Sequence, residues 1–132
     1  MDAHYAVQLT VPAQTGSARL ARLMAVAVAA DAGFTLDETE DLRVAVSELV
    51  SLLVEDHRNV ADEVRLTYQR TPGSVEVTGA RTANPTGEEP SDKVTPDDLA
   101  LEILGVMVDE HDFTQHASGR HFRLLKRTRA QS

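Results

Sequence analysis

The most informative stretch of the sequence is residues 35–54, TLDETEDLRVAVSELVSLLV. Its apolar side chains recur at the three- and four-residue spacing of an amphipathic helix. These positions are Leu42, Ala45, Leu49, Leu52 and Leu53. Thr35 and Glu38 match a capping box, in which a hydroxyl and a carboxylate three residues later satisfy first-turn N–H groups. The stretch therefore predicts a long helix from Thr35 to about Asp56.

Upstream of this helix, the sequence predicts one strand and one further helix. Residues 3–11 alternate in part between apolar and polar side chains and stop at Pro12, as an opening strand does. Residues 18–32 are rich in helix formers and end before Gly33, a residue favoured just past the end of a helix.

Downstream, the sequence predicts two strands, a long loop and a third helix. The two strands flank a turn at residues 71–74, where Pro precedes Gly. Residues 81–94 contain almost no apolar side chain and predict a loop of a length that is usually functional or disordered. Thr95 as the cap and Pro96 as the first helical residue predict a helix that continues to Met107.

Residues 110–115 and 121–127 predict a closing hairpin, so the element order is strand, helix, helix, strand, strand, helix, strand, strand. Most neighbouring strands are linked by hairpins. We therefore expect an α/β fold of the α+β sandwich kind, with a mixed, mainly antiparallel five-stranded sheet and three helices on one face. Residues 1–132 are expected to form a single domain with a core of its own.

The composition excludes several classes of protein and site. The chain has no Cys, which excludes a disulfide framework and a Cys-based zinc site. No apolar run approaches the roughly 20 residues of a membrane span. The first residues lack the features of a signal peptide. We therefore expect a cytoplasmic protein with no membrane partner.

Acidic and basic residues are unevenly placed along the chain. There are 13 Lys and Arg against 21 Asp and Glu, a net charge of −8, yet residues 120–132 hold several bases and no acid. An acidic body with a short basic end argues against nucleic acid as a partner. It suits a basic protein surface instead. Charge alone equally allows the alternative that these side chains only keep the protein soluble.

Few residues have the spacing of a catalytic or metal site. His111, His116 and His121 are five residues apart, which does not bring three imidazoles to one point. Ser47 lies inside a predicted helix rather than on a nucleophile elbow. The glycines are scattered singly and form no phosphate cradle. Glu48 stands out as a carboxylate in an otherwise uncharged run, where it is at the solvent edge, paired or functional.

Residues 42–52, LRVAVSELVSL, resemble the helix that carries the N-box in the anti-sigma factor and serine kinase family of bacterial partner-switching systems. This family is a branch of the GHKL ATPase superfamily. The element order is also similar, and so are residues 101–109 and the final strand, residues 119–127. The resemblance implies the histidine-kinase-like ATPase fold, with the 81–94 loop at the position of the ATP lid.

The resemblance also locates three nucleotide-binding boxes, and each departs from the family pattern. The N-box pairs a Glu with a Mg²⁺-ligating Asn four residues later, but here Glu48 is followed by Leu52, which offers no oxygen to a hard cation. Gly79 stands where the family has its adenine-recognising Asp. The glycine-rich turn of the last helix aligns with residues 98–100, which end at Ala100 and place an acid near phosphate. We therefore expect neither ATP nor a metal as cofactor.

The resemblance further implies an anti-sigma factor that sequesters a sigma factor by direct binding. Release would come from a STAS-type antagonist, and the family forms homodimers through the sheet and the first helix. A family Arg that contacts both partners lies 26 residues before the N-box Glu, and Arg22 stands at that distance from Glu48. With Arg19 one turn earlier, Arg22 is the predicted partner contact, since Arg is also enriched at interface hot spots.

Two alternatives stay open on the sequence. The first is an active serine kinase that phosphorylates its antagonist with Mg-ATP, with Glu48 as general base. The second keeps the fold but closes the 81–94 loop over a ligand other than ATP.

Overall fold

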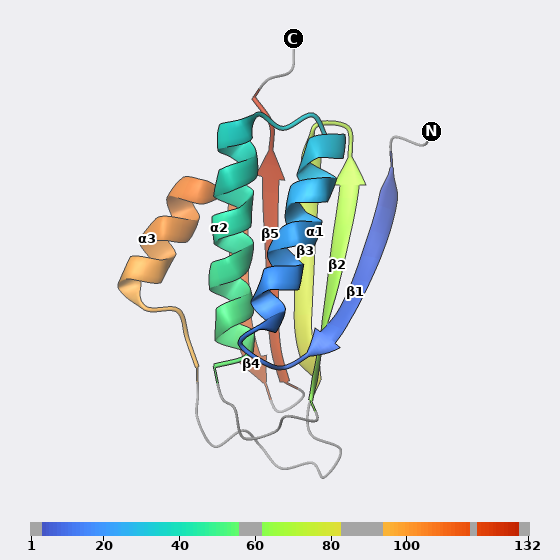
Figure 1. Ribbon diagram of the computed structural model, residues 1–132. Coiled ribbons are helices and arrows are strands. Elements are labelled where there is room, and N and C mark those ends of the chain that lie inside the picture. The colour runs from blue at the N-terminus through green and yellow to red at the C-terminus, as the bar shows by residue number, and fades with distance from the viewer. Residues whose placement is uncertain (1–3, 56–61, 83–93, 117–118, 130–132) are drawn as a thin grey trace.

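The computed structural model describes residues 4–55, 62–82, 94–116 and 119–129. These residues form strands and helices in the predicted order (Figure 1). The elements are β1 (Tyr5–Pro12), α1 (Ser17–Asp31), α2 (Leu36–Leu53), β2 (Glu63–Thr71), β3 (Ser74–Thr82), α3 (Asp98–Met107), β4 (Glu110–His116) and β5 (Gly119–Arg127). Most of the 81–94 loop lies outside the described residues, as do Ala3 and Asp56.

The strands form one sheet in the order β1-β2-β3-β5-β4. Every pairing among the described strands is antiparallel. The connection through α3 carries β4 to the sheet edge, and β5 then pairs between β3 and β4. Figure 1 shows α1 and α2 side by side across one face, with α3 beside α2. The predicted five-stranded, mainly antiparallel sheet is confirmed, and within the described strands no parallel pair makes it mixed.

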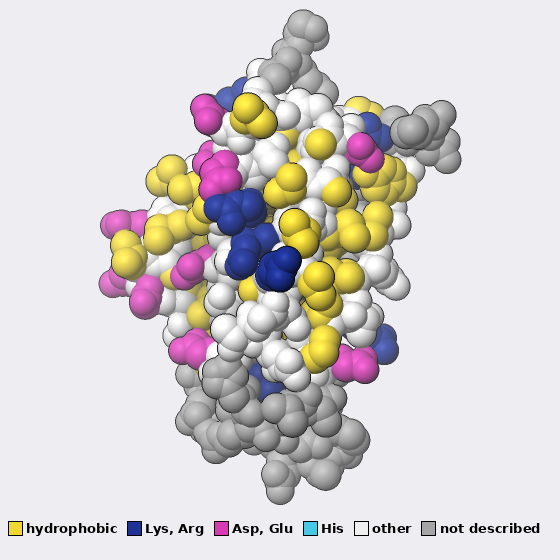
Figure 2. Space-filling model, viewed as in Figure 1, with side chains coloured by type: hydrophobic (Ala, Val, Ile, Leu, Met, Phe, Trp, Pro, Cys, Tyr) yellow, Lys and Arg dark blue, Asp and Glu magenta, His cyan; other side chains and the backbone are white. Residues whose placement is uncertain are grey.

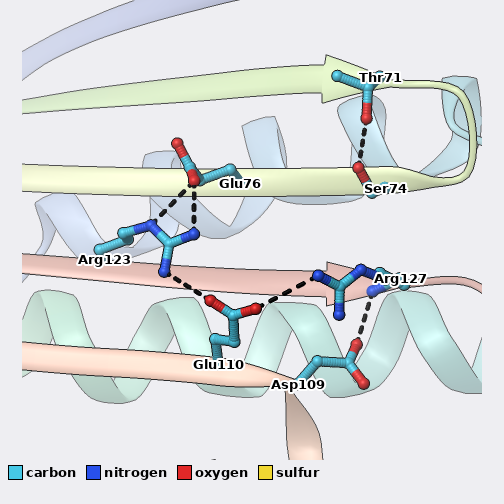
Figure 3. Close-up of polar contacts among 7 residues, drawn as sticks. All are labelled: Thr71, Ser74, Glu76, Asp109, Glu110, Arg123 and Arg127. Carbon is cyan, nitrogen blue, oxygen red and sulfur yellow. Dashed lines mark hydrogen bonds and ion pairs between the residues drawn. The ribbon is translucent and has the colours of Figure 1, made fainter.

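The opposite face of the sheet is polar and charged. Arg123 of β5 bridges two acids on the neighbouring strands, with Nε 2.9 Å from Glu76 and Nη1 3.0 Å from Glu110 (Figure 3). Arg127 also pairs with Glu110, at 3.3 Å. These ion pairs between neighbouring strands are typical of a solvent-facing surface. One face of the sheet is therefore packed under helices and the other is exposed.

The α2 capping box is present as predicted. The Glu38 backbone N–H donates to Thr35 Oγ1 at 3.1 Å, and the Thr35 N–H donates to Glu38 Oε1 at 3.0 Å. The helix ends at Leu53, somewhat before the predicted end near Asp56.

Glu38 also anchors the segment that follows β5. Its carboxylate accepts hydrogen bonds from the Thr128 hydroxyl at 2.6 Å and from the Arg129 N–H at 2.7 Å. Burial raises the pKa of Glu38, but the hydrogen bonds from Thr128, Thr35 and Arg129 outweigh burial and lower it to about 2. The start of α2 and the end of the described chain are therefore held together by one carboxylate.

The predicted start of α3 is wrong by two residues. Thr95 and Pro96 precede the helix, and Asp97 is the N-cap, with its carboxylate accepting from the Ala100 N–H at 2.8 Å. An ionised carboxylate favours the positive end of the helix dipole as well as filling the cap, which explains why Asp97 takes this position.

The core lies between the sheet and the helices. Small residues of α1 and leucines of α2 pack on the inward side chains of β2, β3 and β5. The Tyr68 hydroxyl reaches α1, donating to the Ala21 carbonyl at 2.8 Å within this core. Among the described helices, none is both long and apolar enough to cross a membrane.

Candidate functional site

The residues predicted for the nucleotide boxes lie on α2, β3 and α3. Glu48 and Leu52 are half-buried and one turn apart on α2, Gly79 is buried in the middle of β3, and Ala100 is buried in the first turn of α3. α2 packs on both β3 and α3, so the elements that carry these positions are neighbours.

The space beside Gly79 is filled by an aromatic ring. A Cβ placed on Gly79 would lie 2.3 Å from Cε2 of Phe122 and 2.9 Å from Cδ2 of Leu66. Phe122 is the cross-strand partner of Gly79 on β5, and Leu66 is its partner on β2. An aromatic residue opposite a strand glycine packs over the exposed backbone. The position at which the resemblance places a carboxylate therefore has no room for a side chain.

Two buried arginines contact the C-terminal end of α2. Arg81 and Arg120 are cross-strand partners on β3 and β5, and both are buried. Nη1 of Arg81 donates to the Leu53 carbonyl at 3.0 Å, and Nη1 of Arg120 donates to the Leu52 and Leu53 carbonyls at 3.2 Å each. These carbonyls have no partner within the helix, and the negative end of its dipole attracts cations.

Arg81 is also held by a buried acid. Its Nε lies 3.1 Å from Oδ2 of Asp62, and both side chains are almost fully buried. A buried guanidinium needs a charge partner and filled donors, and Asp62 with the α2 carbonyls supplies both. The end of α2 and the inner face of the sheet are thereby locked together.

Lys126 repeats this arrangement at α3. Its Nζ donates to the Met107 carbonyl at 2.7 Å and lies 3.7 Å from Oδ2 of Asp41. Sequence reasoning missed this role and those of Arg81 and Arg120. The available signal was that all three bases occupy inward positions of strands whose other inward residues are apolar or glycine.

Acidic side chains of the chain itself lie at the N-terminus of α3. The N-terminus of a helix binds phosphate through free N–H groups and a positive dipole. Here the Asp97 carboxylate already accepts from the Ala100 N–H, and Asp98 adds a second acid. The turn therefore presents negative charge where the resemblance places a phosphate.

Residues 11–126 match the family model for the histidine kinase-like ATPase domain. The chain belongs to this family. It is also similar to the crystal structure of the RsbU and RsbW domains of Rv1364c from Mycobacterium tuberculosis, with a TM-score of 0.68 and 20% sequence identity. The match covers 93% of this chain and 32% of that one, so this chain spans about a third of its length. No curated protein matches the sequence.

In this histidine kinase-like ATPase domain, other groups occupy the positions that the resemblance assigns to the nucleotide boxes. The Phe122 ring lies against Gly79, Leu52 has no oxygen or nitrogen in its side chain, and the Asp97 carboxylate accepts from the first turn of α3. Among the described residues, no group of three or more His, Asp or Glu could hold a metal ion.

On α1 of this ATPase domain, the predicted partner residues take different environments. Arg22 is partly buried, and its Nη1 donates to Ser47 Oγ on α2 at 3.0 Å, next to Glu48. Arg19 is exposed, and so are Leu20 and Leu23. Figure 2 shows basic side chains gathered where α1 and α2 meet, with hydrophobic side chains beside them.

Proposed function

We propose that this chain is an anti-sigma factor of the partner-switching type that acts by binding a sigma factor, without ATP. Membership of the histidine kinase-like ATPase family and the likeness to a structure containing an RsbW domain support the general role. The observation that carries the nucleotide-independent mechanism is the Phe122 ring packed against Gly79, because it occupies the space an adenine-recognising side chain needs. The proposal places the protein in the cytoplasm, where sigma factors act.

The face of α1 is the proposed partner surface. Ser47 holds the Arg22 guanidinium in one orientation, which reduces the entropy that a partner must remove on binding. Leu20 is exposed beside Arg19, so the surface combines apolar area with positive charge. Arginines within apolar surroundings are frequent interface hot spots. A STAS-type antagonist would compete for overlapping residues and release the sigma factor.

The same edge of the molecule suits the proposed homodimer. β1 is an edge strand, and its inward residues Tyr5 and Leu9 are only partly buried because α1 does not cover them fully. A second copy could cover this apolar edge together with Leu23. Sedimentation of wild type and Leu23→Glu tests this, since a dimer built here becomes a monomer in the variant.

Two experiments test the function. The first is co-purification from the native host, followed by titration of the recovered sigma factor with wild type, Arg22→Ala and the matched control Arg65→Ala, an exposed Arg on β2. Arg22→Ala is expected to weaken binding by about tenfold or more, and Arg65→Ala to leave it unchanged. Failure to bind any sigma factor of the host, or equal effects of both variants, would overturn the proposal.

The second experiment is calorimetric titration with Mg-ATP. The proposal expects no binding heat, whereas micromolar affinity would favour the alternative, an active serine kinase with Glu48 as general base. That alternative rests on the presence of Glu48, half-buried on α2, and phosphate transfer to a serine of the antagonist would establish it.

A further inference from the structure

α3 has apolar side chains on two sides, and within the described part of the chain only one side is buried. Ala100 and Leu104 are buried against the rest of the molecule. Leu99 is 65% exposed and Val106 is 78% exposed, although both are large hydrophobic residues. Together with the partly buried Ile103 they follow the spacing i, i+4, i+7 and share one helix face. We call Leu99, Ile103 and Val106 the α3 stripe.

Acidic side chains border the α3 stripe. On α3 itself, Asp98 and Glu102 are exposed. On α2, which packs beside α3, acids recur every seven residues along one line of the helix and just past its end. These acids are Asp41, Glu48 and Glu55. Figure 2 shows hydrophobic side chains over α3 with acidic side chains on both sides.

Within residues 94–112 no cation offsets the acids of α3, and of the three α2 acids Asp41 lies near a cation, Lys126. Residues 94–112 contain acids on and after α3 but neither Lys nor Arg. Lys126 lies nearby, but its side chain is only 10% exposed, and it is engaged by the Met107 carbonyl and Asp41. The α3 stripe therefore combines exposed apolar area with a negative border, the opposite sign to the arginines on α1.

This combination selects one kind of occupant. An anionic lipid surface would be repelled by the border, and two copies of the stripe would bring like charges together. An amphipathic helix with leucine-like residues on one face and Lys or Arg at its margins satisfies both the apolar face and the acids. We propose that the α3 stripe is a docking site for a basic amphipathic helix of a partner protein.

The proposed site is separate from the α1 surface and does not depend on ATP or on a sigma factor. It would stand even if the chain had another function. The stripe supplies the apolar contacts that set the dissociation rate, and Glu102 and Asp98 contribute charge attraction that speeds association.

A synthetic peptide of about 18 residues, long enough to form a helix on binding, provides the probe. It contains only Leu and Lys, with Leu at i, i+3, i+4 and i+7 positions. A control peptide has the same composition, but its Leu residues do not share a face. With ¹⁵N-labelled protein, the first peptide is expected to shift the amide signals of residues 98–107. Shifts confined to other elements, or equal shifts with both peptides, would overturn the proposal.

Variants of the protein then test whether the α3 stripe, and not acidic charge alone, accounts for peptide binding. The double variant Leu99→Ser and Val106→Ser is expected to weaken peptide affinity by about tenfold, because both side chains are exposed in the free protein and packed in the complex. Leu36→Ser is the matched control, since Leu36 is 89% exposed at the start of α2. Glu102→Lys is expected to slow association and to reduce its salt dependence. Unchanged affinity in the double variant, or an equal loss in Leu36→Ser, would contradict a site at the stripe.

Discussion

Gly79→Ala is expected to destabilise the protein, although alanine is ordinarily the better residue inside a strand. The new Cβ would lie 2.3 Å from Phe122 Cε2 and 2.9 Å from Leu66 Cδ2, where ordinary contacts are 3.4–4 Å. Overpacking of this kind costs about 1–3 kcal/mol. Replacing a strand glycine returns about 0.5–1 kcal/mol. The difference is about 0–2.5 kcal/mol, and because both neighbours would lie closer than 3.0 Å to the new Cβ we expect a net loss in the free energy of unfolding of about 1–2 kcal/mol.

Urea denaturation measures this loss as a lower midpoint, by roughly 0.5–1 M for a typical dependence on denaturant. Gly105→Ala is the matched control, because Gly105 lies in α3 and an added Cβ there meets nothing within 4 Å. It is expected to stabilise the protein by up to about 1 kcal/mol, the helix propensity difference.

A second substitution tests whether Phe122 is the side chain that the new Cβ meets. In a Phe122→Leu background the ring atoms nearest Gly79 are absent, so Gly79→Ala should cost about 1–2 kcal/mol less than in wild type. If Gly79→Ala is as stable as wild type, or if its cost is the same in both backgrounds, Phe122 does not fill the position as inferred here. The case against an adenine-recognising side chain at Gly79 would then fall too.

Three further predictions concern polar contacts. Arg81→Met is expected to cost about 3–5 kcal/mol in urea denaturation because it leaves Asp62 buried and unpaired, and adding Asp62→Leu should recover part of the loss. Tyr68→Phe removes a buried hydrogen bond to Ala21 and should cost about 1 kcal/mol by the same measurement. The pKa of Glu38 is lowered from 4.5 to about 2, so its contribution to stability is complete above pH 4.5 and is lost as the pH falls towards 2. Melting temperatures should therefore fall less steeply over that range in Glu38→Gln than in wild type, and parallel curves would contradict this role.

Much of the fold could be predicted because its signals are local. The capping box at Thr35 and Glu38, the helical spacing through α2 and the turn before Ser74 each depend on residues close together in the chain. The start of α3 was misplaced because Thr95 followed by Pro96 matches a cap and a first helical residue, although Asp97, two positions later, is the stronger cap and also meets the helix dipole.

The candidate site was predicted only in part. Leu52, Gly79 and Ala100 were identified through a resemblance, and their packing could not be anticipated from it. Phe122 was missed because it lies 43 positions from Gly79 in the sequence and becomes its neighbour only through the β3–β5 register. Partner binding by Arg22 and Arg19 stays a prediction that the proposed titrations address.

Through its resemblance, the sequence predicted that Leu52, Gly79 and Ala100 stand at nucleotide-box positions without the usual side chains. By itself it also determined most of the helices and strands and which face of each is apolar. These properties follow from backbone preferences and from periodicity, which act over a few residues. Only the tertiary structure decided what replaces the missing side chains. It brings the Phe122 ring over Gly79 and directs Arg81 and Arg120 to the carbonyls at the end of α2. It also leaves the α3 stripe uncovered, because strand register and helix packing join residues that the chain keeps far apart.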